Sequence, residues 1–274
     1  MDIRQTRAAQ WLTIAAATWF GIALLAQWAF GAYIVAFYGP ALANGEFESW
    51  NRLAALGVHP YRPGDSVGNL SFLAHALGAG VIALGGAVQL IPSVRRRWPR
   101  FHRINGRLFL LTVVLLTLTG LYLVWLRNEP PATLVGLATT VNGLLILGFA
   151  WLTMRHARAR ELVAHRRWAL RLYLVSNAQW FMRIGVFAWF VFNGLLGRQA
   201  KFADAFIAFW SFGCFLVPLA VLELYLRARE RGGAAFRYAM AAMLALLTLL
   251  TLAGSVAFGL FSLKLVAGSV GDAA

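Results

Sequence analysis

The chain has 274 residues, of which 60% are hydrophobic and 13% are charged, and its mean hydropathy is +0.67. This composition leaves too little polar surface to solvate a globular fold, so it excludes a soluble globular protein and predicts a polytopic membrane protein. The one cysteine, Cys214, excludes an intramolecular disulfide and a cysteine-based metal cluster.

Seven apolar segments follow one another along the chain, and each is long enough to cross a bilayer core, which takes about 20 helical residues. The first is much longer than the apolar core of a signal peptide, so we expect it to be retained. We therefore predict an all-α, polytopic bundle of seven transmembrane helices that forms a single domain over residues 1–274. The segments cover residues 11–37, 70–92, 106–126, 132–154, 169–195, 205–226 and 238–263.

The distribution of basic residues predicts the orientation. Of the 25 Lys and Arg residues, 18 lie toward the side of the amino terminus, six lie toward the opposite side, and Arg183 lies within a segment. Cytoplasmic loops are enriched in Lys and Arg, so we expect a cytoplasmic amino terminus and an outside carboxyl terminus in the bacterial cytoplasmic membrane. The net charge is +15, and we expect the basic loops to bind anionic lipid headgroups. Nucleic acid is not expected as a partner.

The segment of residues 38–69 is the longest loop with a largely polar composition. It contains three prolines, five glycines and three acidic residues. We expect it to form an extracytoplasmic cap, with a short amphipathic helix around "FESWNRLAALG", residues 47–57.

The stretch "HALGAGVIALGGAVQ", residues 75–89, carries a histidine at one end and a glutamine at the other. At 100° per residue, His75 and Gln89 lie about 40° apart and project from one face of a helix. The glycines on this helix favour close packing against another helix, or the close approach of a flat ligand.

The fifth segment carries polar residues at helical spacing. The 18 residues from His165 to Arg183 make five full turns, about 27 Å, and place Ser176 and Gln179 on the same stripe. Such a stripe avoids lipid, so it forms interhelical hydrogen bonds or lines a wet cavity. We expect an outer substrate pocket lined by His75, Gln89, Gln179 and Arg183.

Two further histidines open helices at the cytoplasmic edge. His102, in "RFHRINGR", opens the third segment and His165, in "AHRRWALR", opens the fifth. These imidazoles suit the two axial positions of one heme b, with Arg103, Arg107 and Arg167 meeting its propionates. The alternative is that both histidines cap helix ends and contact lipid phosphates.

Three stretches resemble a bacterial multi-pass membrane family that is known as a domain of unknown function: "HALGAGVIALGGAVQL", "RRRWPRFHRINGRLFLLTVVLLTLTGLYL" and "HRRWALRLYLVSNAQWFMRI". The resemblance covers about residues 70–226, flanked by residues 1–69 and the helix at 238–263. The family pattern carries over to His75, Gln89, His102, Arg103, Gly106, Arg107, His165, Arg166, Arg167, Trp168, Arg171 and Arg183.

The family pattern also places a Pro-Asn pair and a glutamate in the sixth helix. Here Leu219 follows Pro218, and Glu223 comes about one residue early. The chain is also similar in architecture, more loosely, to cytochrome b561-type helical bundles, in which histidines on neighbouring helices hold heme.

These observations predict a heme-b-linked or quinone-linked redox protein of the membrane, with a small hydrophobic ligand such as a quinone as a possible partner. The alternatives are a transporter or lipid-handling protein without a cofactor, and an accessory or assembly subunit. The sequence leaves open the substrate, the oligomeric state and whether the protein is an enzyme, because histidines serve cofactor binding and proton-coupled transport equally well.

Overall fold

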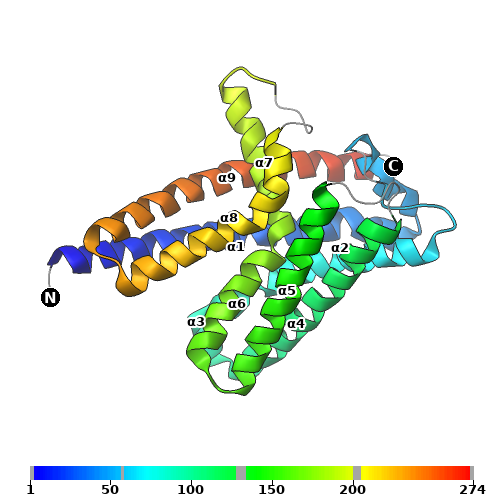
Figure 1. Cartoon of the computed structure of the whole chain (residues 1–274). Helices are drawn as coiled ribbons and strands as arrows, with labels where there is room; N and C mark the ends of the chain where they lie inside the picture. The colour runs from blue at the N-terminus through cyan, green and yellow to red at the C-terminus, as the bar shows by residue number, and fades with distance from the viewer. Residues whose placement is uncertain (1–2, 57–58, 128–133, 200–204, 272–274) are drawn as a thin grey trace. The chain divides into compact units, whose positions relative to one another are not determined.

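The computed structural model describes residues 3–56, 59–127, 134–199 and 205–271, and within these ranges every regular element is a helix (Figure 1). The all-α prediction is therefore confirmed. The elements are α1 (Ile3–Asn44), η1 (Phe47–Leu56), α2 (Ser66–Gly85), η2 (Ala87–Leu90), α3 (Pro92–Arg97), α4 (Pro99–Tyr122), η3 (Leu123–Arg127), α5 (Leu134–Arg158), α6 (Leu162–Ser176), α7 (Ala178–Leu195), α8 (Ala205–Arg231) and α9 (Ala234–Gly271).

Six helical stretches in the described residues are long and apolar enough to span a membrane, in place of the seven that we predicted. These stretches are Ile3–Asn44, Ser66–Leu90, Pro99–Arg127, Leu134–Arg158, Ala205–Arg231 and Ala234–Gly268. The prediction of a protein with several transmembrane helices is confirmed, and the count of seven is not.

The difference arises in the fifth predicted segment. The prediction of one continuous helix over residues 169–195 is wrong. Helix α6 ends at Ser176, and Asn177 leaves the helical region with φ −96° and ψ 12°. The Asn177 side chain donates to the carbonyl of Tyr173 at 2.7 Å, which competes with continuation of the helix. The stripe from His165 to Arg183 is therefore divided between two helices.

The short helix expected in the loop of residues 38–69 is present as the 3₁₀ helix η1. Its Trp50 is 1% exposed, and the indole packs edge-on against Tyr38 with 5.7 Å between ring centroids. Phe72 of α2 lies 6.3 Å from the same indole. This aromatic contact fixes the loop against α1 and α2.

The chain divides into two compact units, which are described separately. The first unit comprises Met1–Gln27 and Ala178–Phe258, and the second comprises Trp28–Asn177 and Gly259–Ala274.

In the second unit, α2 packs on α4, α4 on α5, and α5 on α6 (Figure 1). The α2–α4 contact runs through glycines, because a Cβ at Gly78 would lie 2.2 Å from the Leu116 side chain and one at Gly86 would lie 2.8 Å from Phe109. Missing side chains let the two backbones approach closely. The expectation that these glycines serve close helix packing is confirmed.

Helix α4 has two distinct faces. Phe109, Val113 and Thr117 are buried toward the unit. The opposite stripe is exposed and consists of Leu108, Leu111, Leu115 and Leu118, spaced three or four residues apart. An exposed leucine stripe of this kind is favourable when the solvent is lipid, so this face suits contact with acyl chains.

In the first unit, α1, α8 and α9 share a core of Leu12, Ala228, Met240 and Leu244. Cys214 of α8 is buried, with 3% of its surface exposed, and its thiol donates to the carbonyl of Ser211 at 3.4 Å. The core is apolar, as expected for helices that bury their faces in one another.

Candidate functional site

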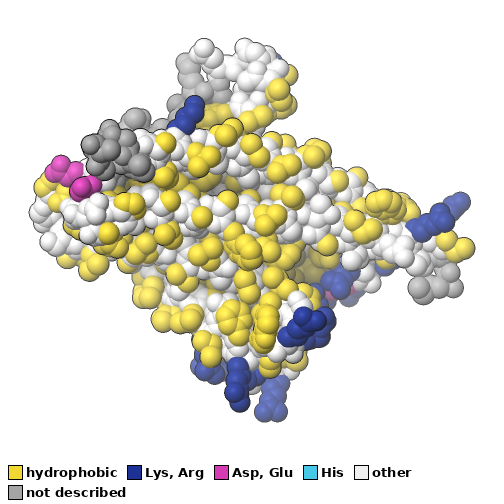
Figure 2. All heavy atoms as spheres, turned by 180° about the vertical axis from the view of Figure 1, so that it is seen from behind, with side chains coloured by type: hydrophobic (Ala, Val, Ile, Leu, Met, Phe, Trp, Pro, Cys, Tyr) yellow, Lys and Arg dark blue, Asp and Glu magenta, His cyan; other side chains and the backbone are white. Residues whose placement is uncertain are grey.

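One end of the second unit is strongly basic, and we call it the basic end. It is formed by α3, the first turns of α4, the last turn of α5 and the first turns of α6. Figure 2 shows Lys and Arg side chains gathered at the lower tip of the molecule. The exposed arginines of these segments are Arg95, Arg96, Arg97, Arg100, Arg103, Arg107, Arg155, Arg158, Arg160, Arg166 and Arg167.

A network of amide groups joins η2 to α4 at the basic end. The carbonyl of His102 can only accept a hydrogen bond, and the backbone N–H of Gly106 can only donate. The amide nitrogen of Asn105 is committed as a donor, because it donates to the carbonyl of Gly85 at 3.1 Å. These groups orient Gln89, so its Nε2 faces His102 and its Oε1 accepts from Asn105 and Gly106.

This orientation determines which nitrogen of His102 carries the proton. Gln89 Nε2 donates to Nδ1 of His102 at 2.9 Å and to its carbonyl at 3.2 Å. Nδ1 is therefore an acceptor, and the proton of the neutral ring is on Nε2. His102 presents an N–H donor to its surroundings.

His165, at the start of α6, has the opposite arrangement. Its Nδ1 lies 3.0 Å from the backbone carbonyl of Thr153 on α5. A carbonyl can only accept, so Nδ1 carries the proton and donates, which leaves the lone pair of the neutral ring on Nε2. His165 therefore presents an acceptor, and its hydrogen bond ties α6 to α5.

The two histidines belong to one electrostatic environment. His165, Arg95 and Arg103 all lie close enough to His102 to interact with its charge.

An open apolar groove of about 790 Å³ lies beside the amide network. Two of its lining residues, Val88 and Phe101, directly precede Gln89 and His102 in the chain. The complete lining is Val88, Val94, Arg97, Trp98, Pro99, Arg100 and Phe101. The groove thus combines an apolar wall with nearby hydrogen-bonding groups, as small-molecule sites usually do.

His75 lies elsewhere in the second unit, at the α2–α4 contact. Its Nδ1 is 3.1 Å from the hydroxyl of Thr119, and this hydroxyl donates to the carbonyl of Leu115 at 2.9 Å. The ring also covers Gly120, where a Cβ would lie 3.0 Å from Cε1. His75 is thus built into helix packing, with Nδ1–H donating to the Thr119 oxygen.

The residues that we predicted for the outer pocket have the following neighbours within their own units. Gln89 lies with His102, and His75 lies with Thr119. Gln179 and Arg183 belong to the first unit, where Arg183 donates to the carbonyl of Gln179 at 2.8 Å. The predicted heme-propionate partners Arg103, Arg107 and Arg167 are all exposed at the basic end.

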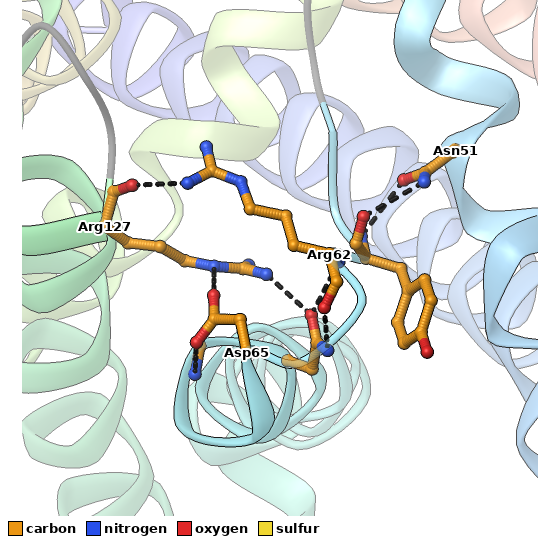
Figure 3. A network of polar contacts seen from close by, with 7 residues as sticks. Asn51, Arg62, Asp65 and Arg127 are labelled. Carbon is orange, nitrogen blue, oxygen red and sulfur yellow. Dashed lines mark hydrogen bonds and ion pairs between the residues drawn. The ribbon is translucent and has the colours of Figure 1, made fainter.

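A second polar network, which the sequence analysis missed, lies at the other end of the second unit (Figure 3). Arg127 is buried, and its guanidinium donates to Asp65 at 2.7 Å and to Asn69 at 2.7 Å. Arg62 in turn donates to the carbonyl of Arg127 at 2.7 Å. The network joins the end of η3 to the start of α2 and closes the loop between η1 and α2.

Asp65 also caps α2. Its Oδ1 accepts from the backbone N–H of Gly68 at 2.8 Å. The hydrogen bond from Arg127, followed by the one from Gly68, holds the pKa of Asp65 below its ordinary value of 3.8. An acidic residue just before an apolar segment is an N-cap signal, and it was the one feature of the sequence that pointed to Asp65.

No group of three or more His, Cys, Asp or Glu side chains in the described ranges is placed to hold a metal ion. A heme with two protein ligands differs from such a cluster and depends on the two histidines alone.

The helices and the polar site define a multi-pass membrane protein with an ionisable site at one end of its helical unit. The family described as "Predicted membrane protein (DUF2306)" matches residues 72–226, which include both histidines and the amide network. The chain therefore belongs to this family, and the predicted membership in a membrane family of unknown function is confirmed. No curated protein and no solved structure matches the chain, and a likeness to cytochrome b561 is not shown.

Proposed function

We propose that this protein binds a quinone head group at the basic end, as part of a redox function in the bacterial cytoplasmic membrane. The observation that carries the proposal is the complementary protonation of the two histidines. His102 offers an N–H donor at Nε2 and His165 offers an acceptor at Nε2.

The chemistry of the head group suits this pair. A quinone carbonyl accepts a hydrogen bond from His102, and the hydroxyl of the reduced form donates one to His165. The apolar groove beside Gln89 suits the ring substituents and the tail of such a ligand. An imidazole can also exchange a proton with the bound molecule.

Heme b is the second candidate, and His165 favours it. A histidine that binds a metal usually donates its other ring N–H to a carbonyl or carboxylate, as His165 does to Thr153. His102 does not fit the second axial position, because Gln89 occupies Nδ1 and the proton occupies Nε2. A transporter or lipid-handling role without a cofactor would use the same groove.

The test is titration of detergent-purified protein with decylubiquinone, followed by tryptophan fluorescence. We expect saturable quenching in the wild type and an affinity loss of about 5- to 150-fold in His102→Phe and Gln89→Leu, since a lost hydrogen bond costs about 1–3 kcal/mol. His59→Leu is the control, because His59 is exposed in the loop before α2.

Equal quenching in all variants, or none in the wild type, would refute quinone binding at this site. A pyridine hemochrome spectrum of wild type and His165→Ala, purified from heme-replete cells, tests the second candidate. A heme signal that His165→Ala loses would replace the quinone proposal with a heme site.

A further inference from the structure

We propose that a separate pocket, where α5 turns into α6, binds the phosphate headgroup of an anionic phospholipid. The pocket has a volume of about 590 Å³. Arg167, Trp168 and Arg171 of α6 line it, and neither Gln89 nor His102 contributes to it. The inference therefore does not depend on the quinone proposal.

The two arginines are placed for recognition of one anion. Arg167 and Arg171 are four residues apart, so they project from the same face of α6. The Arg171 guanidinium lies 4.7 Å from the centroid of the Trp168 ring, and that ring packs 5.3 Å from Phe149. The cation–π contact restrains the guanidinium, whose planar donors match phosphate oxygens.

The acidic residue that lines the pocket is paired. Glu161 forms a short ion pair with Nδ1 of His156, at the edge of the pocket. The lining keeps a net positive charge whether His156 is protonated or neutral, because it contains two arginines and one glutamate. The pocket is therefore complementary to an anion.

The apolar part of the lining indicates a lipid as the source of that anion. Leu162 and Val163 line the pocket and are 69% and 73% exposed. Long side chains on a helix point back toward its amino terminus, so the guanidinium groups of Arg167 and Arg171 reach toward the level of Leu162 and Val163. Apolar residues exposed at that level suit the interface of a membrane, whose anionic phospholipids supply the phosphate for the arginines.

The experiment measures the thermal unfolding midpoint of the full chain in neutral detergent, with added phosphatidylglycerol, phosphatidylcholine or inorganic phosphate. The pocket variant is Arg167→Gln with Arg171→Gln. The matched control is Arg158→Gln with Arg166→Gln, which removes the same charge from exposed residues of the basic end outside the pocket.

We expect phosphatidylglycerol to raise the midpoint of the wild type and of the control equally, and that of the pocket variant by less than half as much. Equal shifts in both double variants would overturn the proposal in favour of diffuse surface charge. An equal shift with phosphatidylcholine, or with inorganic phosphate, would overturn the assignment to an anionic lipid. If the pocket variant does not fold, Arg167→Gln alone serves as the test, and an undiminished shift there overturns the proposal.

Discussion

At the basic end, the side-chain amide of Gln89 determines which ring nitrogen of His102 carries the proton. The sequence analysis singled out both residues, but it assigned His102 to a heme and grouped Gln89 with His75 in an outer pocket. The helical wheel compares angles and ignores axial distance. His75 and Gln89 are 14 positions apart, about 21 Å on a continuous helix, and α2 already ends at Gly85, so each residue has its own partners.

Asp65 leads to a prediction about pH. Its pKa is lowered in the folded protein, so its carboxylate stabilises the fold above the ordinary pKa of 3.8, and this contribution is lost as the pH falls through 3.8 toward the lowered value. We expect the unfolding midpoint of the wild type to fall more steeply below about pH 5 than that of Asp65→Asn. Thermal unfolding from pH 7 to pH 3 measures both slopes, and parallel curves would contradict the role of Asp65.

Thr119 tests whether the His75 hydrogen bond stabilises the α2–α4 contact. Thr119→Val removes the acceptor of the Nδ1–H donor, and we expect a loss of about 0.5–2 kcal/mol, in the range of hydrogen bonds between membrane helices. Thr119→Ser retains the hydroxyl and should stay near the wild type. Denaturant unfolding in mixed micelles compares the variants, and equal losses in both would assign the effect to the methyl group.

At the level of the elements, hydropathy located most helices well but failed where α6 meets α7. Residues 169–195 are apolar enough to suggest one span, whereas the break depends on a single local competition. Asn177 bonds back to Tyr173, and Ser176 donates to the same carbonyl at 3.1 Å. Average hydrophobicity does not detect such side-chain-to-backbone hydrogen bonds. The sequence analysis was therefore right that residues 169–195 are apolar and wrong that they form one continuous helix.

The α2–α4 contact gives a prediction with an internal control. In Gly120→Leu the new side chain meets the His75 ring, where a Cβ alone would lie 3.0 Å from Cε1. We expect this overpacking to cost about 1–3 kcal/mol. Gly148→Leu gains the same helix propensity on α5, and a Cβ at Gly148 has no neighbour within 4 Å. The unfolding free energies of the two variants should differ by the cost of the contact with the His75 ring. Similar values would show that the α2–α4 interface accommodates the new side chain at no cost.

At the level of the whole molecule, the basic residues still favour seven crossings, although the described structure has six continuous spanning helices. The α5–α6 turn and the α8–α9 turn are both rich in arginine, and both are expected in the cytoplasm. This requires α6 and α7 together to make one crossing that is broken at Asn177.

Reporter fusions test this topology. We expect fusions after residues 97, 160 and 231 to report the cytoplasm, and fusions after residues 50 and 129 and at the carboxyl terminus to report the outside. A cytoplasmic carboxyl terminus would show that α6 and α7 do not cross together, and the number of crossings would then be six.

The burial of Cys214 has a practical consequence for mapping this protein. The sole thiol of the chain is 3% exposed and bonded to a backbone carbonyl, so maleimide reagents should reach it slowly in the folded state. The natural sequence therefore provides a low labelling background, and a cysteine introduced at an exposed position would carry most of the probe. Spectroscopic labels can then be attached without first removing a native cysteine.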